Sequence, residues 1–374
     1  MELIWTYTKD YLTASTKNFK FTERLAMFDL DSTLIKPKIG NKKGFPLDEN
    51  DWIWNYPNTK EVLRNLDKLG YSIVIISNQG GMSTGKQTSD VWSKKLNQIC
   101  ISLNLNLHVF CSTDHNKYRK PFPTWFYDFV PETIQNKLDR SMSFYCGDAA
   151  GRPDDFSNTD FKFAMNCMIK FKTPEDLFLG RNISLPVIKY PELPTSNPNF
   201  TFVPKHKEII VMVGLQGSGK SFLSKILNIK YGNFAEISPN GCLKNTHYGY
   251  EIINQDTLKT KAKCIKLLNQ HLNNNKCVII DLTNPDVESR SEWIQLAKNK
   301  NYTARAICMT TTKELAMHNN YFRHMTQGVK VVPKIAYNIY CSKFVKPTKS
   351  EGFDEIIKAS SGKPNDNRYY LYLY

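Results

Sequence analysis

The chain has 374 residues, 41% of them hydrophobic and 12% aromatic, so it is long enough for two folded domains that each bury a core. No apolar run approaches the ~18 residues of a membrane-spanning helix, and the start, MELIWTYTKD, lacks the basic and apolar segments of a secretory signal. Fifty Lys and Arg against 35 Asp and Glu give a net charge of +15, which favours a polyanionic partner without identifying it.

Cysteine usage indicates a reducing compartment. The nine cysteines are scattered singly, without a CxxC pair, so they predict buried free thiols rather than disulfides or a thiolate zinc site. We expect an intracellular protein and a monomer, without a membrane partner. The sequence leaves open whether it acts in the nucleus or in the cytoplasm.

Strand-like and helical segments alternate in the first half of the chain. The apolar runs LAMFDLD, YSIVIISN, LHVFCST and MSFYCGD each end in polar residues. Between the first two, NTKEVLRNLDKLG repeats apolar residues at helical spacing and stops at Gly70. This alternation is typical of an α/β domain, in which helices cover an open parallel sheet and ligands bind at the carboxyl ends of the strands.

A proline-rich stretch divides the chain. Residues 186–204 hold five prolines and little periodicity, so they predict an extended linker between domains at 1–185 and 205–374. The second half restarts with EIIVMVG, a continuous apolar run that suits a buried parallel strand, and KCVIID and YTARAICM follow with helical segments between them. We expect a second parallel-sheet α/β domain there. The terminal RYYLYLY alternates like an edge strand, with a disordered tail as the alternative.

Two carboxylates follow the first strand, in FDLDSTL. Because strand side chains alternate, Asp29 and Asp31 should face the same cleft. Such a pair suits phosphoryl transfer through an acyl phosphate, in which one carboxylate attacks phosphorus and the other protonates the leaving oxygen, with Mg²⁺ offsetting the repulsion. Later strand ends supply complements: Ser77 and Asn78 in ISNQGG as donors to phosphate, Lys120 in YRKP as a counter-charge, and carboxylates in YCGDAAGRPDDFSNTD.

Together these stretches resemble the haloacid dehalogenase superfamily of phosphatases and, more narrowly, the phosphatase domain of the polynucleotide kinase 3′-phosphatase family of DNA end-healing enzymes. The resemblance implies that Asp29 is the nucleophile, that Asp31 is the general acid, and that Ser77 and Lys120 clamp the phosphate. It also implies that acidic side chains bind the metal, and we assign this role to Asp29, Asp31, Asp148 and Asp155. Asp154 and Asp160 are alternatives to Asp155.

Two arginines in this half leave alternatives open, and one serine departs from the family pattern. Arg119 and Arg152 either contact the nucleic-acid backbone or form ordinary surface ion pairs. Ser32 stands where the family usually has the glycine of DGT, and because serine still permits a tight turn, we expect activity to survive.

The second half carries GLQGSGKS, which matches the phosphate-binding pattern GxxxxGK[ST] between a buried strand and a helix. In this pattern backbone N–H groups cradle phosphate at a helix N-terminus, Lys220 reaches the terminal phosphates and Ser221 binds Mg²⁺. The motif therefore predicts a site for ATP as phosphate donor, formed by Gly214, Gly217, Ser218, Gly219, Lys220 and Ser221.

Three further residues complete a candidate kinase site. Asp256 in INQDTLKTK could take the proton of an attacking hydroxyl, Asp281 in KCVIIDLTNPD could hold Mg²⁺ or water, and Arg323 in HNNYFRHMT could clamp the migrating phosphoryl group. Each residue also has a simpler alternative role: Asp256 as a helix N-cap, Asp281 as a solvated acid at a strand end, and Arg323 in a surface ion pair.

These stretches resemble the P-loop kinase domain of the same family, so the resemblance covers nearly the whole chain, in the phosphatase-first order of the animal and fungal enzymes. Gln255 and Tyr321 stand where the family often has arginine, and this loss of charge predicts weaker ATP binding or transition-state stabilisation. The ~20 residues before the first strand leave no room for the forkhead-associated domain of animal relatives, so we expect no phosphopeptide partner of that kind.

The hypothesis that follows is a bifunctional enzyme that removes 3′-phosphate and phosphorylates 5′-hydroxyl at DNA strand breaks, two ends that cannot otherwise be ligated. Two alternatives stay open. One is repair of RNA or tRNA ends, which the 2′-hydroxyl would distinguish, and the other is an end-binding protein with a degenerate kinase.

Overall fold

The computed structural model describes residues 2–38, 46, 48–188, 192–194, 202–231, 234–237, 243–246, 249–362, 366 and 369. The chain divides into two compact units, the first built mainly on Met1–Tyr190 and the second on Pro191–Tyr321 and Lys330–Asn365. Most of the predicted linker at 186–204, and all of the terminal RYYLYLY except Tyr369, lie outside the described residues.

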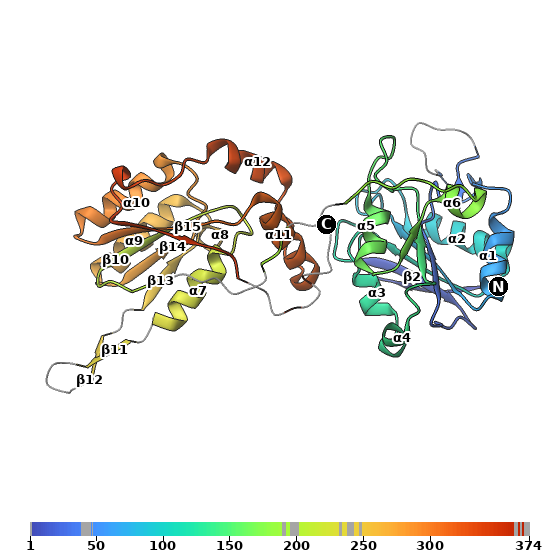
Figure 1. The fold of residues 1–374 in the computed structure, drawn as a ribbon, viewed down its shortest axis with the longest axis horizontal. Coiled ribbons are helices and arrows are strands. Elements are labelled where there is room, and N and C mark those ends of the chain that lie inside the picture. The colour runs from blue at the N-terminus through green and yellow to red at the C-terminus, as the bar shows by residue number, and fades with distance from the viewer. Residues whose placement is uncertain are drawn as a thin grey trace. The chain divides into compact units, whose positions relative to one another are not determined.

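A mostly parallel sheet forms the centre of the first unit (Figure 1). Its strands are Leu3–Tyr7 (β1), Tyr11–Thr16 (β2), Leu25–Phe28 (β3), Ser72–Asn78 (β6), Leu107–Ser112 (β7), Phe144–Cys146 (β8) and Lys170–Lys172 (β9), and Ile35–Lys36 (β4) pairs separately with Ile53–Trp54 (β5). The strand order is β1-β2-β7-β6-β3-β8-β9. β2 is antiparallel to β1 and β7, and the other neighbours are parallel, which confirms the predicted α/β class.

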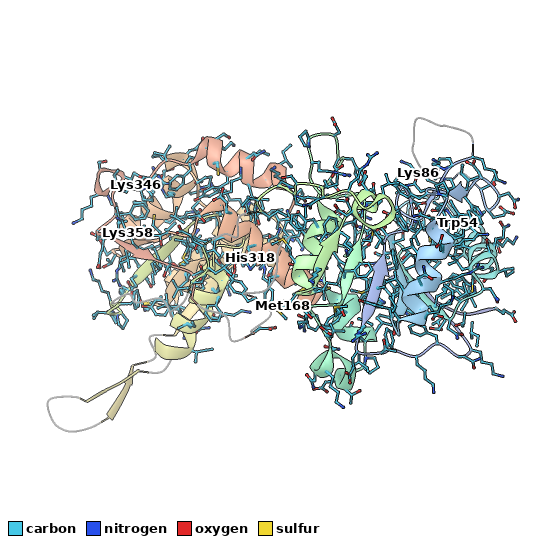
Figure 2. All side chains as sticks on the ribbon, turned by 45° about the vertical axis from the view of Figure 1, so that its right-hand side comes forward. Trp54, Lys86, Met168, His318, Lys346 and Lys358 are labelled. Carbon is cyan, nitrogen blue, oxygen red and sulfur yellow. The ribbon has the colours of Figure 1, made fainter. Side chains whose placement is uncertain are left out.

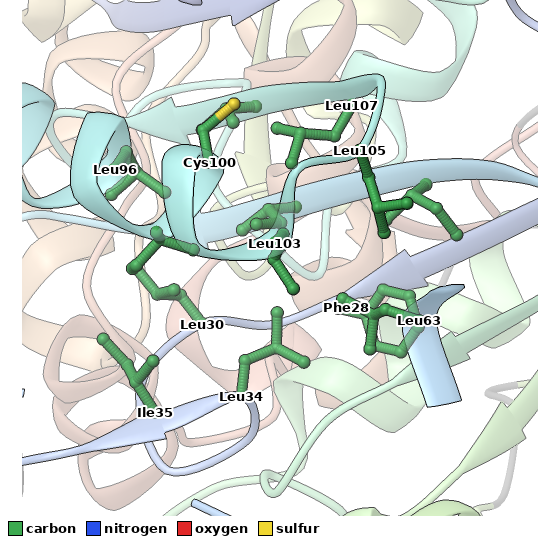
Figure 3. Packing of buried hydrophobic residues seen from close by; sticks show 14 of the residues in the cluster. Phe28, Leu30, Leu34, Ile35, Leu63, Leu96, Cys100, Leu103, Leu105 and Leu107 are labelled. Atoms are coloured by element: carbon green, nitrogen blue, oxygen red, sulfur yellow. The ribbon is translucent and has the colours of Figure 1, made fainter. Parts of the chain in front are cut away.

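Helices pack on both faces of this sheet. They are Thr59–Lys68 (α1), Ser89–Leu103 (α2), Thr124–Phe129 (α3), Glu132–Lys137 (α4), Thr159–Asn166 (α5) and Pro174–Leu179 (α6). Phe28 of β3 packs in one core cluster with Leu63 of α1 and Leu96 of α2 (Figure 3), whereas its neighbour Met27 belongs to a second cluster with Trp125 of α3. Since alternate strand side chains point to opposite faces, β3 is buried on both sides.

The second unit repeats the architecture with an all-parallel sheet. Its strands are Glu208–Val213 (β10), Tyr250–Ile253 (β13), Cys277–Ile280 (β14), Thr303–Met309 (β15) and Glu355–Ala359 (β16), in the order β13-β14-β10-β15-β16, and Phe234–Ile237 (β11) pairs separately with Leu243–Thr246 (β12). The helices are Lys220–Tyr231 (α7), Gln255–Leu258 (α8), Lys261–Asn273 (α9), Val287–Asn299 (α10), Lys313–Gln327 (α11) and Lys334–Lys343 (α12), with a 3₁₀ turn at Lys349–Glu351 (η1). The end of α11, from Phe322 on, is grouped with the first unit.

The central strand of the second unit is also buried on both faces. Val211 of β10 packs with Leu268 of α9 and Trp293 of α10, and Met212 packs with Leu223 of α7. The sheet is therefore enclosed by helices, as the continuous apolar run EIIVMV predicts, and this confirms the second α/β domain.

Many lysines are exposed on the surface of both units. Exposed lysines such as Lys86, Lys346 and Lys358 extend from it (Figure 2), in keeping with the net charge of +15. Trp54 packs edge-to-face against Trp52 with ring centroids 5.3 Å apart, at the margin of the first core cluster. Within the described part of the chain, no helix has both the length and the apolar character needed to cross a membrane.

Candidate functional site

The carboxyl ends of β3 and β8 meet at one edge of the first sheet. β3 ends at the buried Phe28, which pairs with Ile75 of β6 on one side and with Cys146 of β8 on the other. The next residue, Asp29, continues the ladder because its N–H donates to the Cys146 carbonyl at 2.9 Å. This register brings Asp29 and Asp148 to the same edge, where α/β sheets bind ligands.

Lys120 is the centre of the polar contacts at this edge. Its ammonium donates to Asp29 Oδ1 at 2.6 Å, to Asp160 Oδ1 at 2.9 Å and to Tyr145 Oη at 2.6 Å, and only 2% of its side chain is exposed. A buried ammonium requires such partners, and three of them use all three of its protons. Burial lowers the pKa of Lys120, but Asp160 and Asp29 outweigh burial, so the pKa is raised overall and the lysine is charged at neutral pH.

Asp29, Asp148 and Asp160 form a carboxylate cluster, in which one ligand oxygen from each lies within 4.8 Å of the others. Burial raises the pKa of Asp29 well above its ordinary range, although Lys120 opposes the shift. Burial and the neighbouring Asp160 raise the pKa of Asp148 to about 7. Crowded carboxylate oxygens are the hard donors that Mg²⁺ prefers, and a divalent cation would relieve their repulsion, so this donor set fits the predicted metal.

Asp31 does not belong to this cluster in the described part of the chain. Its Oδ2 accepts a hydrogen bond of 2.8 Å from Gln79 Nε2, which also lies 2.7 Å from Ser77 Oγ. Its Oδ1 lies 3.9 Å from the ammonium nitrogen of the buried Lys95 and accepts no hydrogen bond from a described residue. Neither Gln79 nor Lys95 is predicted from the sequence. Gln79 directly follows the predicted pair in ISNQ, whereas Lys95 of α2 belongs to no motif.

Two reciprocal links hold the loops of this site. Asn78 Nδ2 donates to the Lys120 carbonyl at 3.1 Å, and Lys120 N–H donates to Asn78 Oδ1 at 2.9 Å, so the Asn78 amide fixes the lysine loop. Thr33 Oγ1 donates to Asp148 Oδ1 at 3.2 Å and accepts from Asp148 N–H at 3.1 Å. Ser32 has a φ of +63°, the left-handed conformation in which the family's usual glycine carries no steric cost.

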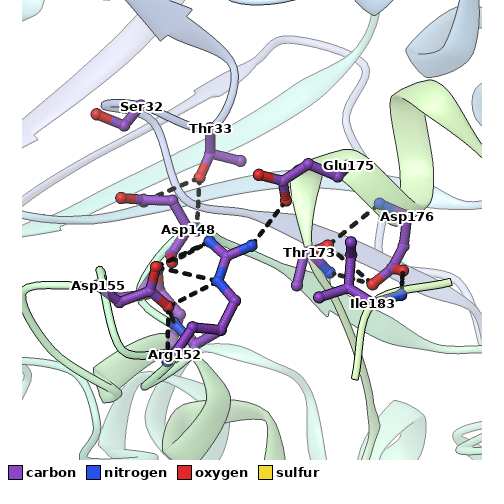
Figure 4. A network of polar contacts seen from close by, with 12 residues as sticks. Ser32, Thr33, Asp148, Arg152, Asp155, Thr173, Glu175, Asp176 and Ile183 are labelled. Carbon is purple, nitrogen blue, oxygen red and sulfur yellow. Dashed lines mark hydrogen bonds and ion pairs between the residues drawn. The ribbon is translucent and has the colours of Figure 1, made fainter. Parts of the chain in front are cut away.

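Asp155 lies against Arg152 (Figure 4). Among Asp154, Asp155 and Asp160, it is Asp160 that the structure brings into the carboxylate cluster. Asp154 is exposed. Arg152 pairs with Asp155 and with Glu175, which matches the ion-pair alternative for this arginine. Arg119 is half-buried, and burial lowers its pKa against the opposing effect of Asp114.

In the second unit GLQGSGKS joins β10 to α7, so the six predicted nucleotide-binding residues lie in one loop and the helix start. Lys220 is buried, and its ammonium donates to the Gly214 carbonyl at 2.9 Å and to the Leu215 carbonyl at 2.7 Å. Ser218 is fully buried, and its hydroxyl has no hydrogen-bond partner among the described residues. Ser221 is exposed at the start of α7, where a ligand can reach it.

Gly217 lies directly against α11. Its φ is +77°, and a Cβ built there would lie 2.3 Å from the carbonyl oxygen of Ala316. Asn319 Nδ2 donates to the Gly217 carbonyl at 2.8 Å. Because an added methyl group cannot fit against a backbone oxygen at this distance, only glycine allows the loop and the helix to pack as they do.

Asn254 links the two predicted acids of the kinase site. Its Nδ2 donates to Asp281 Oδ2 at 3.1 Å, and its Oδ1 accepts from the Asp256 N–H at 2.7 Å as the N-cap of α8. Asp281 follows β14 and is buried, and its Oδ1 has no hydrogen-bond partner in the described part of the chain. Asp256 is exposed in the first turn of α8. Asn254 is not predicted from the sequence, although an N-cap asparagine before DTL is a readable signal.

The remaining predicted kinase residue lies on α11. Arg323 is half-buried there, and its Nε has no hydrogen-bond partner among the residues that the structure describes. Of the two departures from the family pattern, Gln255 is exposed at the start of α8, and Tyr321 is half-buried on α11, where burial raises its pKa.

Residues 24–178 match the family model described as polynucleotide kinase 3 phosphatase, and residues 209–338 match the model of an AAA domain. A bifunctional polynucleotide phosphatase/kinase of Schizosaccharomyces pombe is 37% identical to this chain over 95% of its length and 84% of the relative's. A putative bifunctional polynucleotide phosphatase/kinase of Acanthamoeba polyphaga mimivirus is 36% identical over 89% of this chain and 83% of its own. A polynucleotide 3′-phosphatase of Saccharomyces mikatae is 32% identical over 41% of this chain and 84% of its own.

Proposed function

Since the chain belongs to the family of bifunctional polynucleotide phosphatase/kinases, we propose that it heals DNA strand breaks by one reaction in each unit. The first unit hydrolyses a 3′-phosphate, and the second transfers the γ-phosphate of ATP to a 5′-hydroxyl. The observation that carries the proposal is the cluster of Asp29, Asp148 and Asp160 around the buried Lys120, because it combines a nucleophile, metal donors and a phosphate counter-charge.

In the phosphatase reaction a carboxylate oxygen of Asp29 attacks phosphorus, the bond to the 3′-oxygen breaks, and Asp31 gives its proton to that oxygen. Water then hydrolyses the acyl phosphate, and Asp31 takes the proton of the water. The assignment of Asp31 is supported by its Oδ1, which accepts no hydrogen bond from the described residues. Ser77 is placed to donate to a phosphate oxygen, and the charge of Lys120 offsets that of the phosphate. Asp29, Asp148 and Asp160 would hold Mg²⁺, which would supply further positive charge against the phosphate.

In the kinase reaction Asp256 takes the proton of the 5′-hydroxyl, whose oxygen attacks the γ-phosphorus while the bond to the β-phosphate oxygen breaks. The loop N–H groups and Lys220 bind the donor phosphates, and Arg323 stabilises the charge that develops on the phosphoryl group. Ser221 and Asp281 are the residues that would hold Mg²⁺ here. The link through Asn254 supports this arrangement, since one side chain fixes the loop of Asp256 and the carboxylate of Asp281.

A nicked DNA duplex with 3′-phosphate and 5′-hydroxyl ends tests both reactions in one tube with Mg²⁺ and labelled ATP. We expect the parent chain to convert both ends, Asp29→Asn to lose only 3′-phosphate removal, and Lys220→Met to lose only 5′-phosphorylation. Each variant is the control for the other, because a general folding defect would impair both activities. Unchanged phosphatase activity in Asp29→Asn would overturn the mechanism, and faster conversion of the same ends in RNA would make RNA the substrate class.

A further inference from the structure

The segment between Asp148 and Asp160 is folded around the side chain of Arg152 (Figure 4). The guanidinium Nη2 donates to the Asp148 carbonyl at 3.2 Å, and Nε donates to both Asp155 carboxylate oxygens at 3.0 Å. Asp155 Oδ2 in turn accepts from the N–H groups of Ala150 at 3.0 Å and of Arg152 at 3.1 Å. Arg152 and its partner Asp155 therefore fix the backbone at Asp148 and on its C-terminal side, next to a carboxylate of the cluster.

The other end of the guanidinium is held from outside the loop. Nη1 pairs with Glu175 Oε2 at 3.1 Å, and Glu175 lies in the first turn of α6. That helix begins with a capping box in which the Thr173 and Asp176 side chains bond each other's backbone N–H groups. Asp176 Oδ1 also accepts from Ile183 N–H at 2.8 Å, so the helix start that presents Glu175 is fixed on both sides.

These contacts favour the ion-pair alternative for Arg152 over a contact to a nucleic-acid backbone. Its guanidinium already faces two carboxylates and a carbonyl, and its side chain is 22% exposed. The pair with Asp155 uses both Nε and Nη2 of the guanidinium, the paired geometry in which arginine binds a carboxylate most strongly. Glu175 is 27% exposed and has no atom in the carboxylate cluster, and its side chain is linked to the Asp148 loop through Arg152.

We propose that Arg152 and Glu175 are positioning residues for divalent-cation binding, which hold the Asp148 loop in the arrangement that Asp148 shares with Asp29 and Asp160. This inference rests on the metal site of the proposed phosphatase. Groups that orient metal ligands from outside the coordination shell usually change metal affinity by about 10- to 100-fold when removed. The affinity for the cation should therefore depend on Glu175, although this residue coordinates nothing.

The test measures binding of Mn²⁺ alone to the full chain without nucleotide, from the loss of the electron paramagnetic resonance signal of the free ion. Asp148→Asn identifies which binding belongs to the cluster. We expect Glu175→Gln and Arg152→Lys each to weaken that binding about ten-fold, and the double variant to weaken it no further, since both act through one contact. Glu61→Gln, which removes an exposed carboxylate from the first turn of α1, should bind Mn²⁺ as the parent does.

The outcomes separate this inference from the function on which it rests. If Asp148→Asn leaves Mn²⁺ binding unchanged, the metal site of the proposed phosphatase is wrong. If Asp148→Asn loses binding while Glu175→Gln and Arg152→Lys bind as the parent does, the positioning role alone is wrong. Weaker DNA binding by Arg152→Lys with unchanged Mn²⁺ affinity would return this arginine to the nucleic-acid interface. Arg152→Lys keeps the positive charge and loses the paired N–H donors of the guanidinium, so it remains informative if Glu175→Gln does not fold.

Discussion

Replacing Gly217 by alanine should cost most of the kinase activity and none of the phosphatase activity. The residue has a φ of +77°, a conformation that costs an L-residue about 1–2 kcal/mol. The new methyl carbon would also lie 2.3 Å from the Ala316 carbonyl oxygen, which is backbone and cannot rotate away. The loop or α11 must therefore move by roughly 1 Å, a displacement that commonly costs about 100-fold in rate when it reaches a catalytic group. We expect a loss of that order in 5′-phosphorylation.

The assay follows both ends of a nicked duplex, so the phosphatase rate reports on protein concentration and folding in the same reaction. Gly328→Ala is the matched control, because Gly328 has a similar φ of +66° but no atom lies within 4 Å of its added Cβ. It carries the conformational cost without the clash and should keep most of the kinase activity. Parental kinase activity in Gly217→Ala, or equal losses in the two alanine variants, would refute the argument from the Ala316 contact.

Three further changes test other parts of the fold. Burial lowers the pKa of His108 to about 3, so between pH 6.5 and 3 the unfolded chain binds a proton that the folded chain does not. This difference destabilises the fold in acid by up to about 1.4 kcal/mol per pH unit. His108→Gln should remove this pH dependence, which urea unfolding across that range would measure. Arg290→Met leaves the carboxylate of Glu351 buried without its partner at 2.7 Å and should destabilise the second unit by about 3–5 kcal/mol in denaturant, with Glu351→Gln in the same chain recovering part of the loss. Ser32→Gly removes a left-handed serine and should stabilise the first unit by about 1 kcal/mol, and a lower thermal midpoint would contradict the assumed strain.

Local patterns predict the parts of both sites that are encoded in one stretch of chain. The buried strand before Asp29 and the loop from Gly214 to Ser221 are readable because an apolar run, a turn and a helix follow one another directly. The choice between Asp155 and Asp160 is not readable in this way. It depends on how the loop between Asp148 and Asp160 folds around Arg152. That arginine also pairs with Glu175 of α6, which comes later in the chain.

Lys95 illustrates the other limit. It lies on α2, and a lysine on a helix normally faces water. Its burial next to Asp31 follows from the packing of α2 on the sheet, a contact between segments far apart in the chain. Gln79 and Asn254 were closer to prediction, because each adjoins a motif residue whose loop it fixes.

The central place of β3 has a consequence for how the chain is made. Its partner on one side is β8, with Ala26 opposite Phe144, so the ribosome must synthesise the intervening chain before the strand that precedes Asp29 can pair along its second edge. At about 5–20 residues per second this takes on the order of ten seconds. During that time LAMF, which is fully buried in the finished sheet, presents an apolar strand with an open edge. A nascent chain arrested before β8 is therefore the species that we expect to need protection by a chaperone.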